Sequence, residues 1–248
     1  MGWRAIGDMH QRHGNAVTNA VTAKVDHLVV AATSLEEGVA WCERTLGITP
    51  GPGGEHPLMG THNRLFSIAT AQYPSAYFEI IAINKEAVCA RIQGAKCWFD
   101  LENEALQLQL KQNGPQLVHF VASVPRAVPA IKALAGLGLD RGELLAASRM
   151  TANGMLSWKI TVRDDGQRLM QGTLPTLIEW GDVHPTHHMA ASGVKLQSLK
   201  ASQPNTDEIS AAYVAIGLQG TGVVQGPPNL VATLQTPRGL VTLDSKGL

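Results

Sequence analysis

Apolar residues along the chain alternate between the spacing of strands and the spacing of helices. Residues 24–32 (KVDHLVVAA) form a β-branched, apolar run that predicts a buried strand. Ser34 then stands three residues before Glu37, as in a capping box, and LEEGVAWCERTL places apolar side chains on one helical face before Gly47. After a Gly/Pro-rich stretch that predicts a loop and a poor strand, RLFSIAT and AYFEIIAI predict two more strands. The predicted order is strand, helix, strand, strand, strand.

The same order returns twice. A strand at QLVHFVAS, a helix over about residues 125–137, and strands at ELLAASRM, MLSWKITVR and TLIEWG repeat the first unit. A fainter third copy begins at VKLQSLKAS, continues with a helix at TDEISAAYVAIGL, and ends with strands at NLVATLQT and GLVTLDS. The pattern predicts an α+β protein built from tandem βαβββ modules.

These repeats divide the chain into five segments. We expect a flexible N-terminal extension, a first module, a connector with one short helix, a second module and a degenerate third module, at residues 1–23, 24–84, 85–115, 116–190 and 191–248. The extension lacks the compact apolar region of a signal peptide. No apolar run approaches the roughly 20 residues that a membrane-spanning helix needs.

Composition narrows the class of partner. The 248-residue chain has 20 basic and 20 acidic residues and is 44% hydrophobic, as expected for a globular protein. Without a net charge it offers no basic face for phosphates, which argues against nucleic acid as a partner. Its three cysteines have no CxxC spacing, so we expect no disulfide framework and a cytoplasmic location.

Four ionisable residues hold matching places in the first two modules. His27 and Glu79 interrupt the first and last apolar strands of one module, and His119 and Glu179 interrupt the same strands of the next. A buried carboxylate without a partner costs several kcal/mol, so these interruptions need compensation. Because side chains alternate along a strand, all four can point to one concave face, where a divalent cation would satisfy them together. Two imidazoles with two carboxylates suit Zn, Ni, Co, Mn or Fe(II).

Each of these residues also has an ordinary structural explanation. A single histidine in a strand is more often a hydrogen-bonded core residue than a metal ligand, and a single strand glutamate more often faces solvent. All four residues occupy equivalent positions in the two repeats, and this regularity favours the metal site over the ordinary structural explanations.

With these motifs the chain resembles the vicinal oxygen chelate superfamily, and within it proteins that carry a glyoxalase-like domain. The resembling stretches are VDHLVVAATSLEEGVAWCERTLGI, HPLMGTHNRLFSIA, YFEIIAI, CWFDLEN, GPQLVHFVAS and LIEWGDVHP. The resemblance implies paired βαβββ modules that form a cup-shaped, partly closed barrel around one metal, bound by His27, Glu79, His119 and Glu179.

The resemblance also implies a chemistry. It points to a metal-dependent lyase or isomerase that stabilises the enediolate of a small oxygenated substrate of the α-carbonyl type. One carboxylate would leave the metal and act as general base, with Glu179 as the first choice and Glu79 as the second.

Further residues are candidates for substrate contact. His62, Asn63 and Arg64, in GTHNRL, either hold an anionic substrate group at the mouth of the cup or form a loop that bonds its own backbone. Trp98, in the connector, either walls the pocket or pins the connector to the barrel. We interpret the histidines of VHPTHHM as a solvated loop.

The third module limits the functional expectation. Its strands read QSLKA and GLVTL where the ligands would stand, a departure from a glutathione-dependent glyoxalase I. We expect it either to cover a sheet edge or to pair with its counterpart in a homodimer. Two alternatives stay open: an Fe(II)-dependent extradiol-type dioxygenase, for which His27, His119 and Glu179 would suffice, and a non-catalytic protein that binds or sequesters a small molecule.

Overall fold

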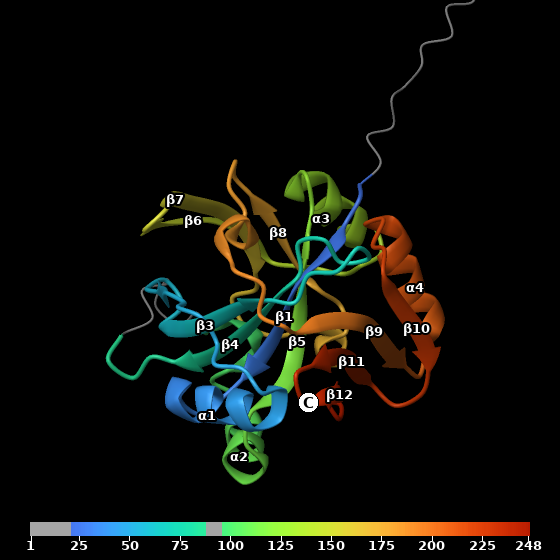
Figure 1. The fold of residues 1–248 in the computed structure, drawn as a ribbon. Helices are drawn as coiled ribbons and strands as arrows, with labels where there is room; N and C mark the ends of the chain where they lie inside the picture. Colours follow the sequence, from blue (N-terminus) through green and yellow to red (C-terminus); the bar gives the residue numbers. More distant parts are fainter. Residues whose placement is uncertain (1–20, 88–95) are drawn as a thin grey trace, which may run out of the picture.

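A computed structural model describes residues 21–87 and 96–248, which fold into two β-sheets with helices packed around them (Figure 1). Most of the predicted N-terminal extension lies outside the described residues, as does the part of the connector that contains Cys89. Within these described ranges, the helices are all too short or too polar to cross a membrane.

The first module forms one half of the larger sheet. Its elements follow the order that the hydrophobic pattern predicts: β1 (Lys24–Ala31), α1 (Leu35–Leu46), β2 (Glu55–His56), β3 (Thr61–Ser67) and β4 (Tyr77–Ile83). Helix α1 begins where the Ser34 hydroxyl accepts a hydrogen bond from the Glu37 N–H, and it ends at Gly47, which adopts a φ of 77°. The bounds predicted for this helix are confirmed.

The connector and the second module follow. The connector contains the 3-10 helix η1 (Trp98–Asp100) and the helix α2 (Glu104–Asn113). The second module repeats the element order, with a 3-10 helix on each side of its last strand: β5 (Gln116–Ser123), α3 (Ala127–Ala135), β6 (Glu143–Thr151), β7 (Gly154–Val162), η2 (Leu169–Gly172), β8 (Thr176–Trp180) and η3 (Pro185–His188). Helix α3 is shorter than predicted, because Arg126 is still extended and the chain turns at Gly136 and Gly138.

Both modules share one curled sheet of eight strands, in the order β2-β3-β4-β1-β5-β8-β7-β6. Strands β1 and β5 pair antiparallel at its centre, so main-chain hydrogen bonds join the two modules. Strands β2 and β6 are the edges, and the Arg149 side chain of β6 lies against Gly54, the residue before β2. The predicted fold class, α+β with tandem βαβββ modules around a cup, is confirmed.

The two faces of this sheet are buried against different partners. On the convex face, Leu28 of β1, Phe78 of β4 and Phe120 of β5 pack with α1 and the second sheet. On the concave face, Val29 of β1 and Val121 of β5 pack with η1 and α2. Strands buried on both faces are apolar almost throughout, so each polar side chain on them requires a specific partner.

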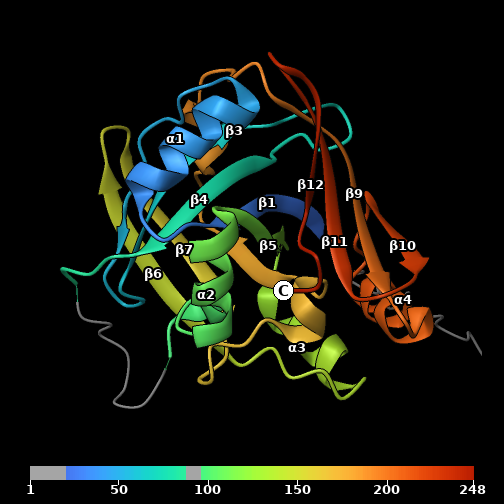
Figure 2. The same ribbon diagram turned by 90° about the horizontal axis from the view of Figure 1, so that it is seen from below.

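The third module forms the second sheet. Its elements are β9 (Lys195–Gln203), α4 (Thr206–Ala215), β10 (Thr221–Gln225), β11 (Asn229–Thr236) and β12 (Gly239–Asp244). The strand order is β10-β9-β11-β12, so the first strand lies in the middle of the sheet instead of at one end, as in the other two modules. Figure 2 shows this sheet beside β1 and β5, where it packs against the convex face and does not extend an edge of the larger sheet.

Candidate functional site

The concave face of the larger sheet encloses a cleft of about 1070 Å³. Residues 52–59 around β2 form one wall, the β6–β7 hairpin forms the opposite wall, and residues 180–189 after β8 contribute a third side. At its inner end lies a smaller space of about 30 Å³. Polar side chains from several elements line this inner space: His27, His56, Asn63, Glu79, Trp98 and Arg149.

His27 of β1 is held by a buried carboxylate. Asp26 Oδ1 accepts a hydrogen bond from His27 Nδ1 at 2.7 Å, and Asp26 Oδ2 accepts from Trp180 Nε1 at 2.9 Å and from His184 Nε2 at 3.0 Å. Burial raises the pKa of Asp26, but the hydrogen bonds from His184 and His27 outweigh it and lower the pKa to about 2. Because this carboxylate can only accept, Nδ1 of His27 carries the proton, and Nε2 is the nitrogen left for the cleft.

Glu79 of β4 faces His27 across the inner space. Its Oε2 lies 3.6 Å from His27 Nε2, and its Oε1 accepts a hydrogen bond from Asn63 Nδ2 at 2.6 Å. The Asn63 amide is fixed in turn, because its Oδ1 accepts from the Gly54 N–H at 2.8 Å. Each member of the facing pair is therefore oriented by a partner behind it, and 3.6 Å is longer than a hydrogen bond between the two.

His56 of β2 completes this network as a neutral imidazole. Asn63 Nδ2 lies 3.3 Å from His56 Nε2, and His56 Nδ1 lies 3.1 Å from Thr61 Oγ1. Since the amide nitrogen can only donate, Nε2 accepts and Nδ1 carries the ring proton. Burial, followed by the nearby Arg149 charge, lowers the pKa of His56 to about 3.

His119 of β5 lies on the concave side, opposite Val29, but its ring is fully hydrogen-bonded. Nδ1 donates to the Gly172 carbonyl at 2.9 Å, and Nε2 accepts from the Thr176 N–H at 3.1 Å and lies 3.0 Å from Thr176 Oγ1. Burial, followed by the Arg141 charge, holds the pKa of His119 well below its usual range. No lone pair is left for a metal, so His119 is a hydrogen-bonded core residue.

Glu179 lies on the convex side of β8, contrary to our expectation. Ile178 belongs to the concave core and Trp180 lines the inner space, so the residue between them points the other way. Its Oε2 accepts from the Ala127 N–H at 2.7 Å, in the first turn of α3, and its Oε1 accepts from Lys159 Nζ at 2.8 Å. Partial burial raises the pKa of Glu179, but the hydrogen bonds from Lys159 and Ala127 outweigh it, and the pKa is lowered.

The four predicted metal ligands therefore do not come together. His27 and Glu79 share the inner space, while the other two side chains are committed to partners elsewhere. In the parts of the chain that the structure describes, no three His, Cys, Asp or Glu side chains gather in an arrangement that could hold a metal ion. Neither the four-residue site nor the three-residue set of a dioxygenase fits this geometry.

The residues predicted for substrate contact are also divided between the two faces of the sheet. Asn63 points into the cleft, whereas His62 and Arg64 alternate with it along β3 and lie on the convex side, near Glu36 of α1. Arg64 therefore does not lie at the mouth of the cup, where we expected it to hold an anionic substrate group. Trp98 lines both the cleft and its inner space, with its ring edge-on to His56 at 5.0 Å between centroids.

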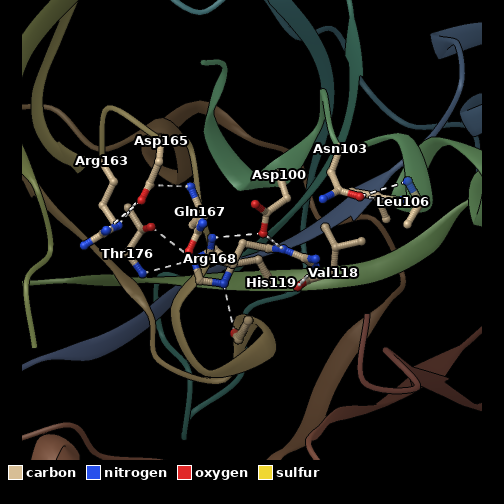
Figure 3. A network of polar contacts seen from close by, with 12 residues as sticks. Asp100, Asn103, Leu106, Val118, His119, Arg163, Asp165, Gln167, Arg168 and Thr176 are labelled. Carbon is tan, nitrogen blue, oxygen red and sulfur yellow. Dashed lines mark hydrogen bonds and ion pairs between the residues drawn. The ribbon is translucent and has the colours of Figure 1, made fainter. Parts of the chain in front are cut away.

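The segment that carries Trp98 is also tied firmly to the sheet. Arg168 Nε donates to Asp100 Oδ2 at 2.9 Å, and Arg168 Nη1 donates to the Val118 carbonyl at 2.8 Å, as seen in Figure 3. Cys97 Sγ donates to the Met59 carbonyl at 2.7 Å. The two explanations considered for Trp98, a pocket wall and a pin for the connector, thus both describe its position.

Four residues of the site are not among those expected from the sequence: Asp26, His56, Arg149 and His184. His184 was interpreted as part of a solvated loop, but the segment after β8 folds back and places its ring on Asp26. Asp26 itself should alternate with His27 and face the other side, but a β-bulge between Val25 and His27 changes this alternation. Arg149 lies on an edge strand, where an arginine gives no signal of reaching a buried site.

Several solved structures are similar to this chain. A hypothetical protein from Staphylococcus aureus has a similar fold, with a TM-score of 0.53 and 13% identity over 90% of this chain and 85% of that one. Methylmalonyl-CoA epimerase from Streptomyces coelicolor, solved with 2-nitronate-propionyl-CoA, has a TM-score of 0.40 and 15% identity over 66% of this chain and 99% of that one. The Mycobacterium tuberculosis methylmalonyl-CoA epimerase has a TM-score of 0.36 and 17% identity over 69% and 94%.

A search of curated proteins gave no match. The model of the glyoxalase-like domain family, in contrast, matches residues 25–217, well over half of the chain. This span includes both halves of the curled sheet and the start of the third module. The chain therefore belongs to the glyoxalase-like domain family.

Proposed function

We propose that this protein is an isomerase or lyase that moves a proton at a carbon next to a carbonyl group of a small oxygenated substrate. His27 and Glu79 are the acid–base pair. The observation that carries the proposal is their arrangement: His27 Nε2 and Glu79 Oε2 face each other at 3.6 Å at the inner end of a cleft, each held from behind.

The spacing suits a pair that divides a proton transfer between two groups. An efficient general base must reach the proton it removes and must keep a free lone pair, which His27 Nε2 does because Asp26 engages only Nδ1. When the imidazole takes a proton, the Asp26 carboxylate stabilises the resulting cation without becoming protonated itself. Glu79, oriented by Asn63, lies across the same space and in its protonated form can give a second proton to the opposite side of the substrate. His27 then releases its proton to water and Glu79 takes one up, which restores the pair.

Metal chemistry needs separate treatment, because members of the superfamily commonly use divalent metals. In this chain the geometry of His119 and Glu179 does not support the four-ligand arrangement, since His119 is bonded to Gly172 and Thr176, and Glu179 to the Ala127 N–H and Lys159. The roles assigned to His27 and Glu79 therefore rest on their own hydrogen bonds and positions. The family membership supports the reaction class, and the substrate is left to the experiment.

Solvent-exchange measurements test the proposal directly. We would incubate the protein in D₂O with methylglyoxal, dihydroxyacetone and a series of 2-oxo acids, and follow loss of the proton signal next to the carbonyl by NMR. His27→Asn and Glu79→Gln should each slow exchange by roughly 100-fold or more, the usual contribution of a positioned acid or base. His62→Asn is a matched control on the other face of the sheet and should leave the rate unchanged.

Two outcomes would contradict this assignment. Exchange at the wild-type rate in His27→Asn would remove His27 from the chemistry. No exchange with any compound, combined with tight binding of one of them, would favour the alternative in which the cup binds or sequesters a ligand without converting it.

A further inference from the structure

Three buried N–H donors at the inner end of the cleft have no acceptor within the described ranges 21–87 and 96–248. They are Nε1 of Trp98 and Nε and Nη1 of Arg149. Trp98 is only 7% exposed, and both residues line the cleft and its inner space. A buried donor without a partner costs about 1–3 kcal/mol and a charged one more, so such groups are rarely left unpaired without a reason.

The carboxylates nearby do not supply the missing acceptor. Glu79 is the acidic residue that lines the same inner space, but its oxygens are directed to Asn63 and His27. Among the residues that the structure describes, no carboxylate lies within ion-pair distance of Arg149. All three unpartnered atoms are N–H donors, and two of them belong to the charged Arg149 guanidinium, so an oxyanion would satisfy all three.

Arg149 is placed where it would meet a ligand that enters the cleft. It extends from the edge strand β6 toward the opposite edge, where its Nη1 lies 1.5 Å from the position that a Cβ on Gly54 would occupy. Glycine at this position therefore lets the guanidinium lie against the backbone beside β2. A methyl group there would force the guanidinium away, and this relation provides a way to move the charge without removing it.

The rest of the cleft is mainly apolar. Leu58, Met59, Leu145, Met155, Leu156 and Trp158 line the part between the inner space and the outside. Leu58 and Met155, at the rim, are 40% and 54% exposed, as expected for apolar side chains that a bound ligand would cover. A volume of about 1070 Å³ is at the upper end of the range for pockets that hold drug-sized molecules, and far larger than a three-carbon substrate needs.

We infer that Arg149 and Trp98 form the binding site for the carboxylate of an organic acid whose apolar body fills the outer cleft. This inference rests on the proposed function for the reacting carbon, which a carboxylate held here would place beside His27 and Glu79. It moves the anion-binding role that the sequence suggested for Arg64 to an arginine on the opposite side of the cup.

Binding of a matched pair of probes tests the inference. We would titrate the protein by calorimetry with 4-phenylbutanoate and with 4-phenylbutanamide, which differ only in the charge of the head group. A charge-assisted, bidentate contact should make the acid bind about 10-fold or more tightly than the amide. Acetate, which has the charge without the apolar body, should bind at least about 100-fold more weakly than the phenyl acid, and equal affinity would show a site for a free anion instead.

Four variants measure how much each part of the site contributes to the preference for the acid. Arg149→Met keeps much of the aliphatic stem and should abolish the preference for the acid while leaving the affinity for the amide unchanged. Gly54→Ala should reduce the preference although the arginine is still present, and Trp98→Phe should reduce it a few-fold by removing the indole N–H. Arg64→Met, on the convex side, is the matched arginine control and should change nothing.

Several results would overturn the inference. These are equal affinities of wild-type protein for acid and amide, an acid preference that survives in Arg149→Met, and no binding of either probe at millimolar concentration. The outcome can be separated from that of the proposed function, because His27→Asn should lose proton exchange and keep the acid preference. A preference for the acid without exchange in the wild type would leave this site standing and remove the proposed reaction.

Discussion

Replacing Glu179 with glutamine tests whether this side chain acts in the cleft or stabilises the convex face of the sheet. The change keeps the shape of the side chain and removes one negative charge. If Glu179 were the general base, proton exchange would collapse. The structure instead places this carboxylate against the first turn of α3 and beside Lys159, so we expect a loss of stability and an unchanged exchange rate.

The size of that loss follows from the two contacts. A negative charge at the N-terminus of a helix contributes about 0.3–1 kcal/mol, and the hydrogen bond to Ala127 N–H stabilises the same turn. The ion pair with Lys159 contributes less than about 1 kcal/mol, because the lysine side chain is 52% exposed and water screens the pair. The sum is a decrease of about 1–2 kcal/mol in the free energy of unfolding, or roughly 2–8 °C in Tm for a chain of this length.

Two measurements on the same protein preparation decide the question. Urea denaturation gives the change in stability, and NMR in D₂O gives the exchange rate. The pH dependence provides a further check: the pKa of Glu179 is lowered in the folded state, so its contribution is present above the ordinary carboxylate range and is lost as the pH falls through the folded pKa. A Glu179→Gln protein with wild-type stability and exchange reduced more than about 10-fold would refute the assignment of faces.

Three other predictions address the remaining histidines and the metal. Because the pKa of His56 is lowered to about 3, the unfolded chain binds a proton between pH 6.5 and 3 that the folded chain does not. Stability should therefore fall as the pH is lowered through this range, by roughly 4–5 kcal/mol from this group at about 1.4 kcal/mol per pKa unit, and urea denaturation of His56→Gln should lack this contribution. An equal pH dependence of the two proteins would argue against a neutral His56. His119→Gln should lower the free energy of unfolding by about 2–4 kcal/mol, since it leaves buried partners at Gly172 and Thr176 unpaired, whereas His62→Gln should change it by less than about 0.5 kcal/mol. Incubation with a chelator should shift Tm by less than about 1 °C in differential scanning calorimetry, whereas a tightly bound structural metal would produce a drop of several degrees.

The order of elements could be predicted from the sequence because it depends on local patterns. The apolar spacing, the Ser34 cap and the terminating Gly47 specify α1 without reference to the rest of the molecule. Which face of the sheet a side chain takes depends on the alternation along its strand, and this is harder to determine from the sequence. In β4 both faces are apolar, and the pattern cannot tell which side Glu79 takes. In β8, however, Ile178 and Trp180 are both apolar and flank Glu179, and this alternation should have placed Glu179 outside.

Other features of the site depend on contacts between distant parts of the chain. His119 loses its lone pair to Thr176, 57 residues away, and no local pattern contains that information. His184 reaches Asp26 across 158 residues, and Arg149 reaches the inner space from an edge strand that contains no buried residue. Of the four repeated His and Glu positions, those of the first module line the inner space and those of the second do not, because the partners of each side chain decide where it points.

The packing of the second sheet has a consequence for the time course of synthesis. Leu28 and Phe120, on the convex face of the first two modules, are covered by Leu196, Leu199 and Leu234 of the third. A ribosome adding 5–20 residues per second finishes the curled sheet some seconds before β11 emerges, and during that interval a broad apolar surface is uncovered. A nascent chain stalled after residue 190 should therefore be held by chaperones or aggregate, and the release of the full-length chain should coincide with the docking of β9 and β11.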